Sequence, residues 1–127
     1  MHPKAQTVLL GFQAFGEGDM EALRGILAGN VTWHVAGRNK WSADYSGPEA
    51  VVRYLSGVST AATIETRPHA VLADDDHVVI LGAASSSRNH KSFTTNIAYV
   101  FHVKEGRITE AWVIPADQHG QDESWAD

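Results

Sequence analysis

The stretch VFHVKEGRITEAWV, residues 100–113, predicts a β-hairpin, and the register of this hairpin decides which side chains face the interior of the fold. A two-residue turn requires Glu105 to adopt a positive φ, which is unfavourable for glutamate. A type I turn followed by a left-handed Gly106 needs only the conformational freedom of glycine. We therefore predict the bulged turn, in which Phe101 faces Thr109.

This register assigns the residues of both strands to two faces of a sheet. One face carries Ile97, Tyr99, Phe101, Ala111 and Val113, with Asp117 beyond the strand end. The opposite face carries Asn96, Ala98, Val100, His102, Ile108, Glu110, Trp112 and Ile114. Since both faces are too apolar for water, we expect one to lie against helices and a pocket and the other to pair with a second copy of the chain. A two-residue turn would turn residues 107–115 over relative to residues 92–103 and put Trp112 beside Tyr99.

The rest of the chain predicts the elements around this hairpin. Segments 64–72, 77–87, 92–103 and 107–115 are rich in β-branched and aromatic residues and read as an antiparallel meander. Apolar spacing predicts two helices within residues 6–27, with Asp19 as N-cap of the second, and a third helix starting at Pro48. Residues 31–37 predict a strand and residues 38–47 a loop or weak hairpin. The tail 117–127 is either frayed or a short helix docked by Trp125.

These elements predict a single α+β domain over residues 1–127, with three N-terminal helices packed on a strongly curved antiparallel sheet that leaves a pocket. The chain has 127 residues, no cysteine and a net charge of −5. The missing cysteines exclude disulfides and thiolate chemistry, and the acidic balance disfavours nucleic-acid binding. No segment predicts a membrane span or a signal peptide, so we expect a cytoplasmic protein.

Motif searching indicates neither a metal nor a cofactor. None of the seven histidines stands at HExxH-type ligand spacing with a carboxylate. The sequence contains no Gly-x-Ser-x-Gly elbow, phosphate loop or dinucleotide glycine pattern, so hydrolase triads and nucleotide chemistry lack support. We expect no metal ion and no organic cofactor.

Two blocks of sequence carry a resemblance to a known family. They are GDMEALRGILAGNVTWHVAG, residues 18–37, and GRITEAWVIPADQ, residues 106–118, with DYSG at residues 44–47 before a predicted helix. In this order of elements the chain resembles SnoaL-like proteins of the NTF2-like superfamily, which includes ketosteroid isomerases and polyketide cyclases. The resemblance covers about Val8 to Trp125. It implies a cone-shaped fold, an apolar cavity between sheet and helices, frequent homodimers and no cofactor.

Two predictions compete for His34. Strand alternation turns Val31, Trp33 and Val35 inward and leaves His34 facing solvent. The resemblance instead aligns His34 with the carboxylate base of the steroid isomerases, which points it into the pocket. A pocket histidine suits general-base work because its ordinary pKa of about 6.5 lies near neutral pH. We adopt the inward orientation.

The resemblance also suggests further site residues. Asp117 lies where SnoaL cyclases carry an acid–base aspartate, although an N-cap of the last helix is its other interpretation. The oxyanion-stabilising positions of the isomerases correspond to Gly11 and Tyr99, which disfavours steroid isomerisation by their mechanism. Tyr99 is either a donor to a substrate carbonyl or a core aromatic. We expect the pocket to be lined by Phe12, Phe15, Trp41, Asp44, Tyr45, Tyr54, Ile97, Phe101 and Val113. The resemblance places Asp44 and Tyr45 at the pocket mouth, and a turn before the helix that starts at Pro48 is their other interpretation.

We therefore predict a small-molecule pocket protein that forms a homodimer through the sheet face centred on Trp112. Its expected reaction is cofactor-free proton transfer, meaning isomerisation, aldol cyclisation or dehydration, on an apolar or polyketide-like substrate bearing a carbonyl group. His34 or Asp117 would be the base, and Tyr99 would donate to the developing enolate oxygen. The alternative is a non-catalytic ligand-binding or dimerisation module. Epoxide hydrolysis, a third class, needs an arginine between two carboxylates, and no such trio is evident.

Overall fold

The four strands of the predicted meander form one continuous antiparallel run in the computed structural model, which describes residues 2–127. They are β3 (Thr63–Ala73), β4 (Val78–Arg88), β5 (Lys91–Lys104) and β6 (Arg107–Pro115). β1 (Leu27–Val35) lies parallel to β6, and the short β2 (Ala43–Ser46) pairs antiparallel with β1. The six-stranded sheet therefore has the order β2-β1-β6-β5-β4-β3.

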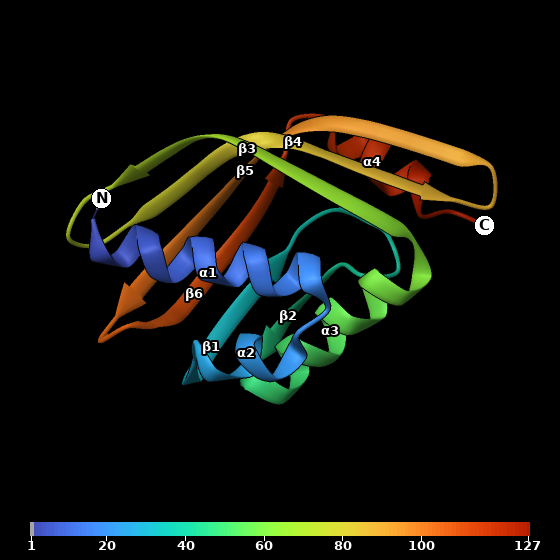
Figure 1. Ribbon diagram of the computed structural model, residues 1–127. Helices are drawn as coiled ribbons and strands as arrows, with labels where there is room; N and C mark the ends of the chain where they lie inside the picture. The colour runs from blue at the N-terminus through green and yellow to red at the C-terminus, as the bar shows by residue number, and fades with distance from the viewer. Residues whose placement is uncertain (1) are drawn as a thin grey trace.

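Four helices accompany this sheet. α1 (Pro3–Glu17) and α2 (Met20–Gly25) precede β1, α3 (Pro48–Ala61) follows β2, and α4 (Gln118–Ser124) follows β6. The curved sheet arches over α1, α2 and α3, whereas α4 lies at the end of the sheet nearest the C-terminus (Figure 1). The α+β class is as predicted. The predicted strand at 31–37 and the weak hairpin at 38–47 correspond to β1 and β2, and the short C-terminal helix left open by the sequence is α4. The antiparallel prediction is wrong for one pair, because β1 and β6 are parallel.

The helices begin and end where local sequence signals lie. The Asp19 carboxylate accepts a hydrogen bond from the backbone N–H of Ala22 at 3.0 Å, as expected of an N-cap. Pro48 occupies the first turn of α3, where its missing N–H has no helical partner to lose. Gly18 ends α1 in the left-handed conformation, with φ 71°. These short-range signals explain why the helix positions could be predicted.

The hairpin between β5 and β6 closes differently from the prediction. Its turn has only two residues, Glu105 at φ 54° and Gly106 at φ 74°, so the predicted bulged turn is wrong. Two positive φ angles give a turn whose twist matches that of the flanking strands, which offsets the unfavourable conformation of glutamate. A bulge occurs instead within β6, where Val103 pairs with Ile108 and His102 pairs with Glu110.

This bulge leaves Thr109 without a paired residue on β5. Beyond Thr109, each residue of β6 faces the opposite side of the sheet from the one it would face without the bulge. Phe101 consequently pairs with Ala111 and still faces the interior, while Trp112 lies on the opposite face, as predicted. Ile108 is the exception, because it is buried on the inner side and not on the outer face. The two-residue turn and the bulge at Thr109 each shift the pairing, and together they restore the predicted faces for most of the hairpin.

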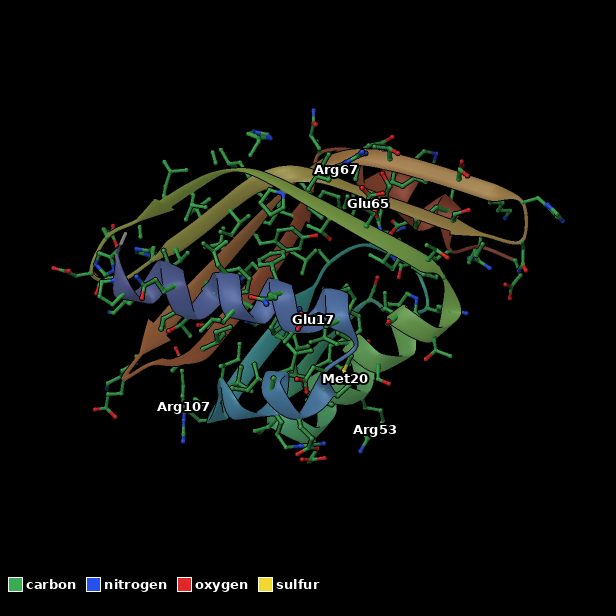
Figure 2. The ribbon with its side chains drawn as sticks, viewed as in Figure 1. Glu17, Met20, Arg53, Glu65, Arg67 and Arg107 are labelled. Carbon is green, nitrogen blue, oxygen red and sulfur yellow. The ribbon has the colours of Figure 1, made fainter. Side chains whose placement is uncertain are left out.

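The core lies between the helices and the inner face of the sheet. Charged side chains such as Arg53 on α3 and Arg107 at the start of β6 project away from the body of the fold (Figure 2). None of the helices formed by residues 2–127 is long and apolar enough to cross a membrane. The most deeply buried large side chains are Val8, Val31, Val51, Val78 and Ile80.

Candidate functional site

A cavity of about 150 Å³ lies between the helices and the inner face of the sheet. Its walls come from α1, α2, α3 and α4, from five strands and from residues 36–41. A cavity of this size, lined by apolar side chains, can hold a molecule with roughly one aromatic ring. Of the residues expected in the pocket, those that line it are Phe12, Phe15, Trp41, Tyr54, Ile97, Phe101 and Val113.

Aromatic rings in edge-to-face contact form much of the wall. On the sheet side, Trp33 packs on Phe101 with ring centroids 5.8 Å apart, and Phe12 of α1 packs on Tyr99 at 5.0 Å. At the other end, Trp41 packs on Tyr54 at 6.0 Å and on Trp125 at 5.7 Å. Such rings present large, rigid apolar surfaces. The cavity wall therefore favours a mainly apolar molecule.

The lining residues within the described chain include no Asp, Glu, His, Lys or Arg side chain. The titratable groups in this wall are the phenols of Tyr54 and Tyr99. Burial raises the pKa of both hydroxyls, and the neighbouring phenols of Tyr45 and Tyr99 add to the rise at Tyr54. The Thr66 side chain opposes part of the rise at Tyr99. Both phenols therefore remain protonated near neutral pH and can donate hydrogen bonds.

His34 does not line the cavity and lies on the outer face of the sheet. Its neighbours Trp33 and Val35 both line the cavity, and adjacent strand residues point to opposite faces. The imidazole sits between two carboxylates, with Nδ1 at 2.7 Å from Asp44 Oδ1 and Nε2 at 2.7 Å from Glu110 Oε2. The predicted inward orientation is therefore wrong, and the alternation of residues 31–35 gives the observed one.

The outer-face cluster, meaning Asp44, His34, Glu110, Trp112 and His102, joins four strands. The His34 ring stacks on Trp112 at a centroid distance of 5.2 Å, and His102 Nδ1 lies 3.6 Å from Glu110 Oε1. Hydrogen bonds to Glu110 and then Asp44 raise the pKa of His34, while partial burial opposes the rise. This favours the imidazolium form, which binds both carboxylates.

Asp44 and Tyr45, expected at the pocket mouth, also lie outside the cavity lining. Asp44 belongs to β2 and pairs across to His34, so its carboxylate is used in the outer-face cluster. Tyr45 stacks on Tyr54 at 4.6 Å, behind the wall, and its hydroxyl donates to the Trp41 carbonyl at 2.6 Å. Tyr45 therefore supports two residues of the wall, Tyr54 and Trp41, whereas Asp44 contacts His34 on the outer face.

Asp117 is an exposed N-cap of α4 and does not line the cavity. Its Oδ1 accepts a hydrogen bond from the backbone N–H of Gly120 at 2.8 Å, and its own N–H donates to Thr95 Oγ1 at 3.1 Å. The helix-cap interpretation therefore describes its position. Of the three expected catalytic residues, Tyr99 alone reaches the cavity, so the structure does not bring His34, Asp117 and Tyr99 together.

The C-terminal helix and the segment 36–42 close one end of the cavity together. Asp122 of α4 accepts hydrogen bonds from the Asn39 side chain at 2.7 Å and from the Arg38 backbone N–H at 3.0 Å. Gln118, Gln121 and Trp125 contribute to the lining from this end. The sequence reasoning missed these residues, although the lone Trp125 in a polar tail indicated a docked helix.

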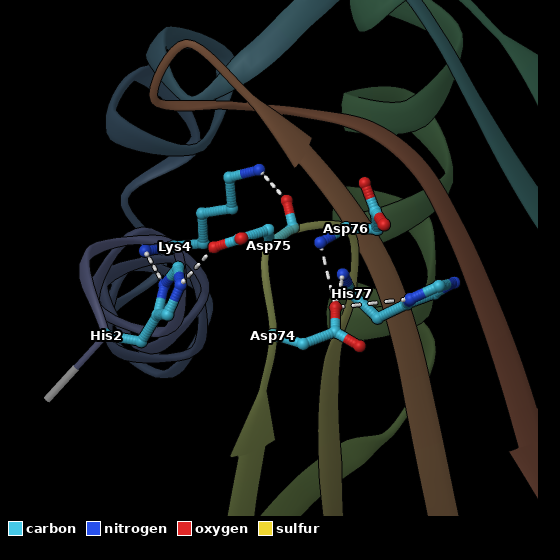
Figure 3. Close-up of polar contacts among 6 residues, drawn as sticks. All are labelled: His2, Lys4, Asp74, Asp75, Asp76 and His77. Carbon is cyan, nitrogen blue, oxygen red and sulfur yellow. Dashed lines mark hydrogen bonds and ion pairs between the residues drawn. The ribbon is translucent and has the colours of Figure 1, made fainter.

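Within residues 2–127, one cluster of side chains has the spacing of a metal site, namely Asp74, Asp76 and His77 in the β3–β4 turn. All three are exposed. The Asp74 carboxylate already accepts hydrogen bonds from the backbone N–H groups of Asp76 at 2.8 Å and His77 at 2.7 Å (Figure 3). This is the hydrogen bonding of a tight turn, in which an aspartate accepts from residues that follow it.

Comparison with known proteins identifies relatives of this fold. The family model of the SnoaL-like domain matches residues 10–111. The solved structure of Bal32a, from a soil-derived mobile gene cassette, is 28% identical with a TM-score of 0.93, and the match covers 98% of this chain and 97% of that one. A search of curated proteins finds no match.

Two further solved structures share the fold at lower identity. A putative polyketide cyclase from Xanthomonas campestris pv. campestris is 18% identical with a TM-score of 0.81, over 98% of this chain and 97% of that one. TerC, co-crystallized with polyporic acid, is 15% identical with a TM-score of 0.85, over 98% of this chain and 100% of that one. At these identities the comparisons establish the architecture.

Proposed function

Because the chain belongs to the SnoaL-like domain family, we propose that its cavity binds an uncharged, largely apolar molecule carrying a carbonyl oxygen. One observation carries the proposal: within the described chain, the cavity wall is aromatic and uncharged, and its titratable groups are two protonated phenols. A charged ligand would lose its hydration in this cavity without gaining a counter-charge. A carbonyl oxygen, in contrast, can accept a hydrogen bond from Tyr99 or Tyr54.

Binding is better supported than the expected proton transfer. General-base catalysis needs a group that accepts a proton within hydrogen-bond reach of the substrate. His34 and Asp117 lie outside the cavity, and a tyrosine acts as a base only as phenolate, a form that burial disfavours at Tyr54 and Tyr99. TerC, which has a similar fold, was co-crystallized with polyporic acid, and this supports the proposal that a fold of this kind binds small molecules.

Calorimetric titration with two matched probes tests this proposal. 4-Ethylacetophenone is neutral and carries one carbonyl, whereas 4-ethylbenzoate has a similar outline and a negative charge. We expect the ketone to bind and the carboxylate to bind far more weakly. Tyr99→Phe should weaken ketone binding by roughly threefold to tenfold, the effect of one lost hydrogen bond. Equal binding of the two probes, or binding of neither, would contradict the proposal.

We also propose that a second copy of this chain covers the outer face of the sheet. Across this face Leu72 faces Val79, which faces Val100, which faces Trp112, so apolar side chains form one row. Leu72 is 53% exposed and Ile114, on the same face, is 50% exposed. A contiguous apolar patch of this kind is typical of an interaction site. A symmetric dimer would bury the same patch on both copies.

Light scattering combined with size-exclusion chromatography tests the dimer. The unchanged protein should elute as a dimer, and Trp112→Glu should give a folded monomer because it places a charge within the apolar row. Leu10→Glu is the control, since Leu10 is 58% exposed on α1, away from the sheet face. A dimer that persists in Trp112→Glu but dissociates in Leu10→Glu would place the interface elsewhere.

A further inference from the structure

Trp112, which the proposed second copy would cover, is in contact with two histidine rings on the same face of the sheet. The His34 ring stacks on it at a centroid distance of 5.2 Å, and the His102 ring meets it edge-on at 5.0 Å. Glu110 joins the two histidines, with Oε2 at 2.7 Å from His34 Nε2 and Oε1 at 3.6 Å from His102 Nδ1. These three charged side chains are between 27% and 38% exposed in the single chain. A second copy that covers Trp112 therefore also lies against both imidazoles and this carboxylate.

The outer-face cluster continues in both directions across the sheet. Beyond His34 it ends on β2 at Asp44, whose Oδ1 lies 2.7 Å from His34 Nδ1. Beyond His102 the His77 ring follows, with the two ring centroids 4.9 Å apart. His77 Nδ1 in turn lies 3.3 Å from Asp74 Oδ1 in the β3–β4 turn (Figure 3). Carboxylates and imidazoles are therefore equal in number along this line of contacts.

Equal numbers of acidic and basic groups suit an interface between two copies of the same chain. A symmetric dimer brings one patch against itself, so the patch must carry both charges to pair with its copy. With protonated imidazoles, His34 and His102 neutralise the charges of Asp44 and Glu110. With neutral imidazoles, the two carboxylates leave a net charge of minus two on each copy. Like charges repel most strongly where water is excluded.

The charged side chains of the neighbouring strands keep their charge between pH 6 and pH 9. Lys104 and Arg107 pair at the end of the β5–β6 hairpin, and on β3 Arg67 Nη1 lies 3.6 Å from Glu65 Oε1 (Figure 2). Lysine, arginine and glutamate side chains ordinarily titrate outside this range. Among these groups, the change of charge on the face therefore falls on the imidazoles of the cluster.

We propose that the outer-face cluster makes dimerisation dependent on pH, with the dimer tightest when His34 and His102 carry protons. This inference rests on the dimer proposed above and adds regulation to the same interface. Imidazoles ordinarily lose their protons as the pH rises through about 6.5, and the hydrogen bonds to Glu110 and then Asp44 raise the pKa of His34 above that value. Because the dimer binds these protons more tightly than the monomer, its dissociation constant should rise at least about tenfold from pH 6 to pH 9.

Sedimentation equilibrium of the full chain tests this inference at pH 6, 7.5 and 9 over a dilution series. The unchanged protein should show the rise in dissociation constant, while far-ultraviolet circular dichroism shows the same helix and strand content at each pH. At pH 9, 1 M NaCl should restore part of the dimer, because salt screens the repulsion between the carboxylates. The same salt should strengthen the dimer less at pH 6, where the charges of the cluster are neutralised.

A double variant removes the titration and keeps a donor beside each carboxylate. In the combination of His34→Gln with His102→Gln, the glutamine amides donate hydrogen bonds but carry no charge, so the dissociation constant should be the same at pH 6 and pH 9. His119→Gln is the matched control and should keep the full pH dependence, because His119 pairs with Glu123 on α4 and is 85% exposed. Glu110→Gln should reduce the rise, since one carboxylate fewer is left without a counter-charge at pH 9.

Two results would overturn the inference and leave the dimer standing. One is a dimer fraction in the unchanged protein that is as large at pH 9 as at pH 6, or larger, at every dilution, a measurement that requires no variant to fold. The other is undiminished pH dependence in the folded double variant, because groups outside the cluster would then cause it. A monomer at every pH and concentration would instead remove the proposed dimer, and the inference with it.

Discussion

Replacing His34 should remove a pH-dependent part of the stability. The imidazole joins β2 to β6 through Asp44 and Glu110, each at 2.7 Å, and the His34 side chain is 27% exposed. Both ring nitrogens can donate only in the imidazolium form. Neutral imidazole keeps a single N–H and therefore satisfies one carboxylate.

The sign of the effect follows from the raised pKa of His34 in the folded protein. Protonation stabilises the fold fully below the ordinary histidine pKa of about 6.5, and this stabilisation is lost as the pH rises through the folded-state pKa. Each partly exposed ion pair contributes roughly 0.5–1 kcal/mol, so the two together contribute about 1–2 kcal/mol.

Urea unfolding at pH 6 and at pH 9 measures this contribution. His34→Gln should lower the free energy of unfolding by about 1–2 kcal/mol at pH 6 and by clearly less at pH 9. His119→Gln is the matched control, because His119 also faces a carboxylate, Glu123 at 3.0 Å, but is 85% exposed. It should change stability little at either pH. If His34→Gln costs the same at both pH values, the contact with Trp112 and not the charge explains the loss.

Three further predictions concern the cavity and its supports. Asp117→Ala should lower the free energy of unfolding by about 1 kcal/mol and leave the affinity for 4-ethylacetophenone unchanged. Asp117→Ser should recover most of this loss, because serine also caps helices. Lost ligand binding at full stability would refute the cap role. Gly57→Ala should push on the Trp41 ring, whose atoms lie 3.0 Å from the new Cβ, and weaken 4-ethylacetophenone binding in titrations. Gly16→Ala, with open space around its Cβ, should not. Asp122→Ala should release the segment 36–42, because it removes the acceptor for the Asn39 side chain and the Arg38 backbone N–H. Stopped-flow experiments should then show faster ligand dissociation. An unchanged rate would show that the ligand does not leave through this end of the cavity.

The secondary structure could be predicted because its signals are local. Asp19 and Pro48 mark helix starts, and β-branched runs between short turns mark the strands. The parallel pairing of β1 with β6 has no such signal, since it joins segments distant in sequence and depends on the whole fold. The register of the last hairpin depends on Glu105, whose unfavourable φ is outweighed by the match between turn and strand twist.

The cavity wall was more predictable than the chemistry within it. Large aromatic residues such as Phe12 and Phe101 line the cavity. They could be predicted because the spacing of apolar residues identifies the buried side of each helix and strand. His34 and Asp117 were predicted as base and acid from positions matched to a family, and a position in the sequence does not fix the direction of a side chain. Asp117 shows the difficulty, because a carboxylate after a strand can equally cap the next helix.

The orientation of His34 follows from the packing of its neighbours. Turning His34 inward requires β1 to slip by one residue against β6, which would undo the pairing of Trp33 with Ala111 and expose both Trp33 and Val35. Burial of one large apolar side chain stabilises a fold by roughly 1.5–3 kcal/mol, and the slip would also separate His34 from Asp44 and Glu110. The same packing that forms the cavity wall therefore keeps the imidazole out of it. On β1, a side chain that accepts a proton from a molecule in this cavity would have to stand at position 33 or 35, where Trp33 and Val35 line the wall.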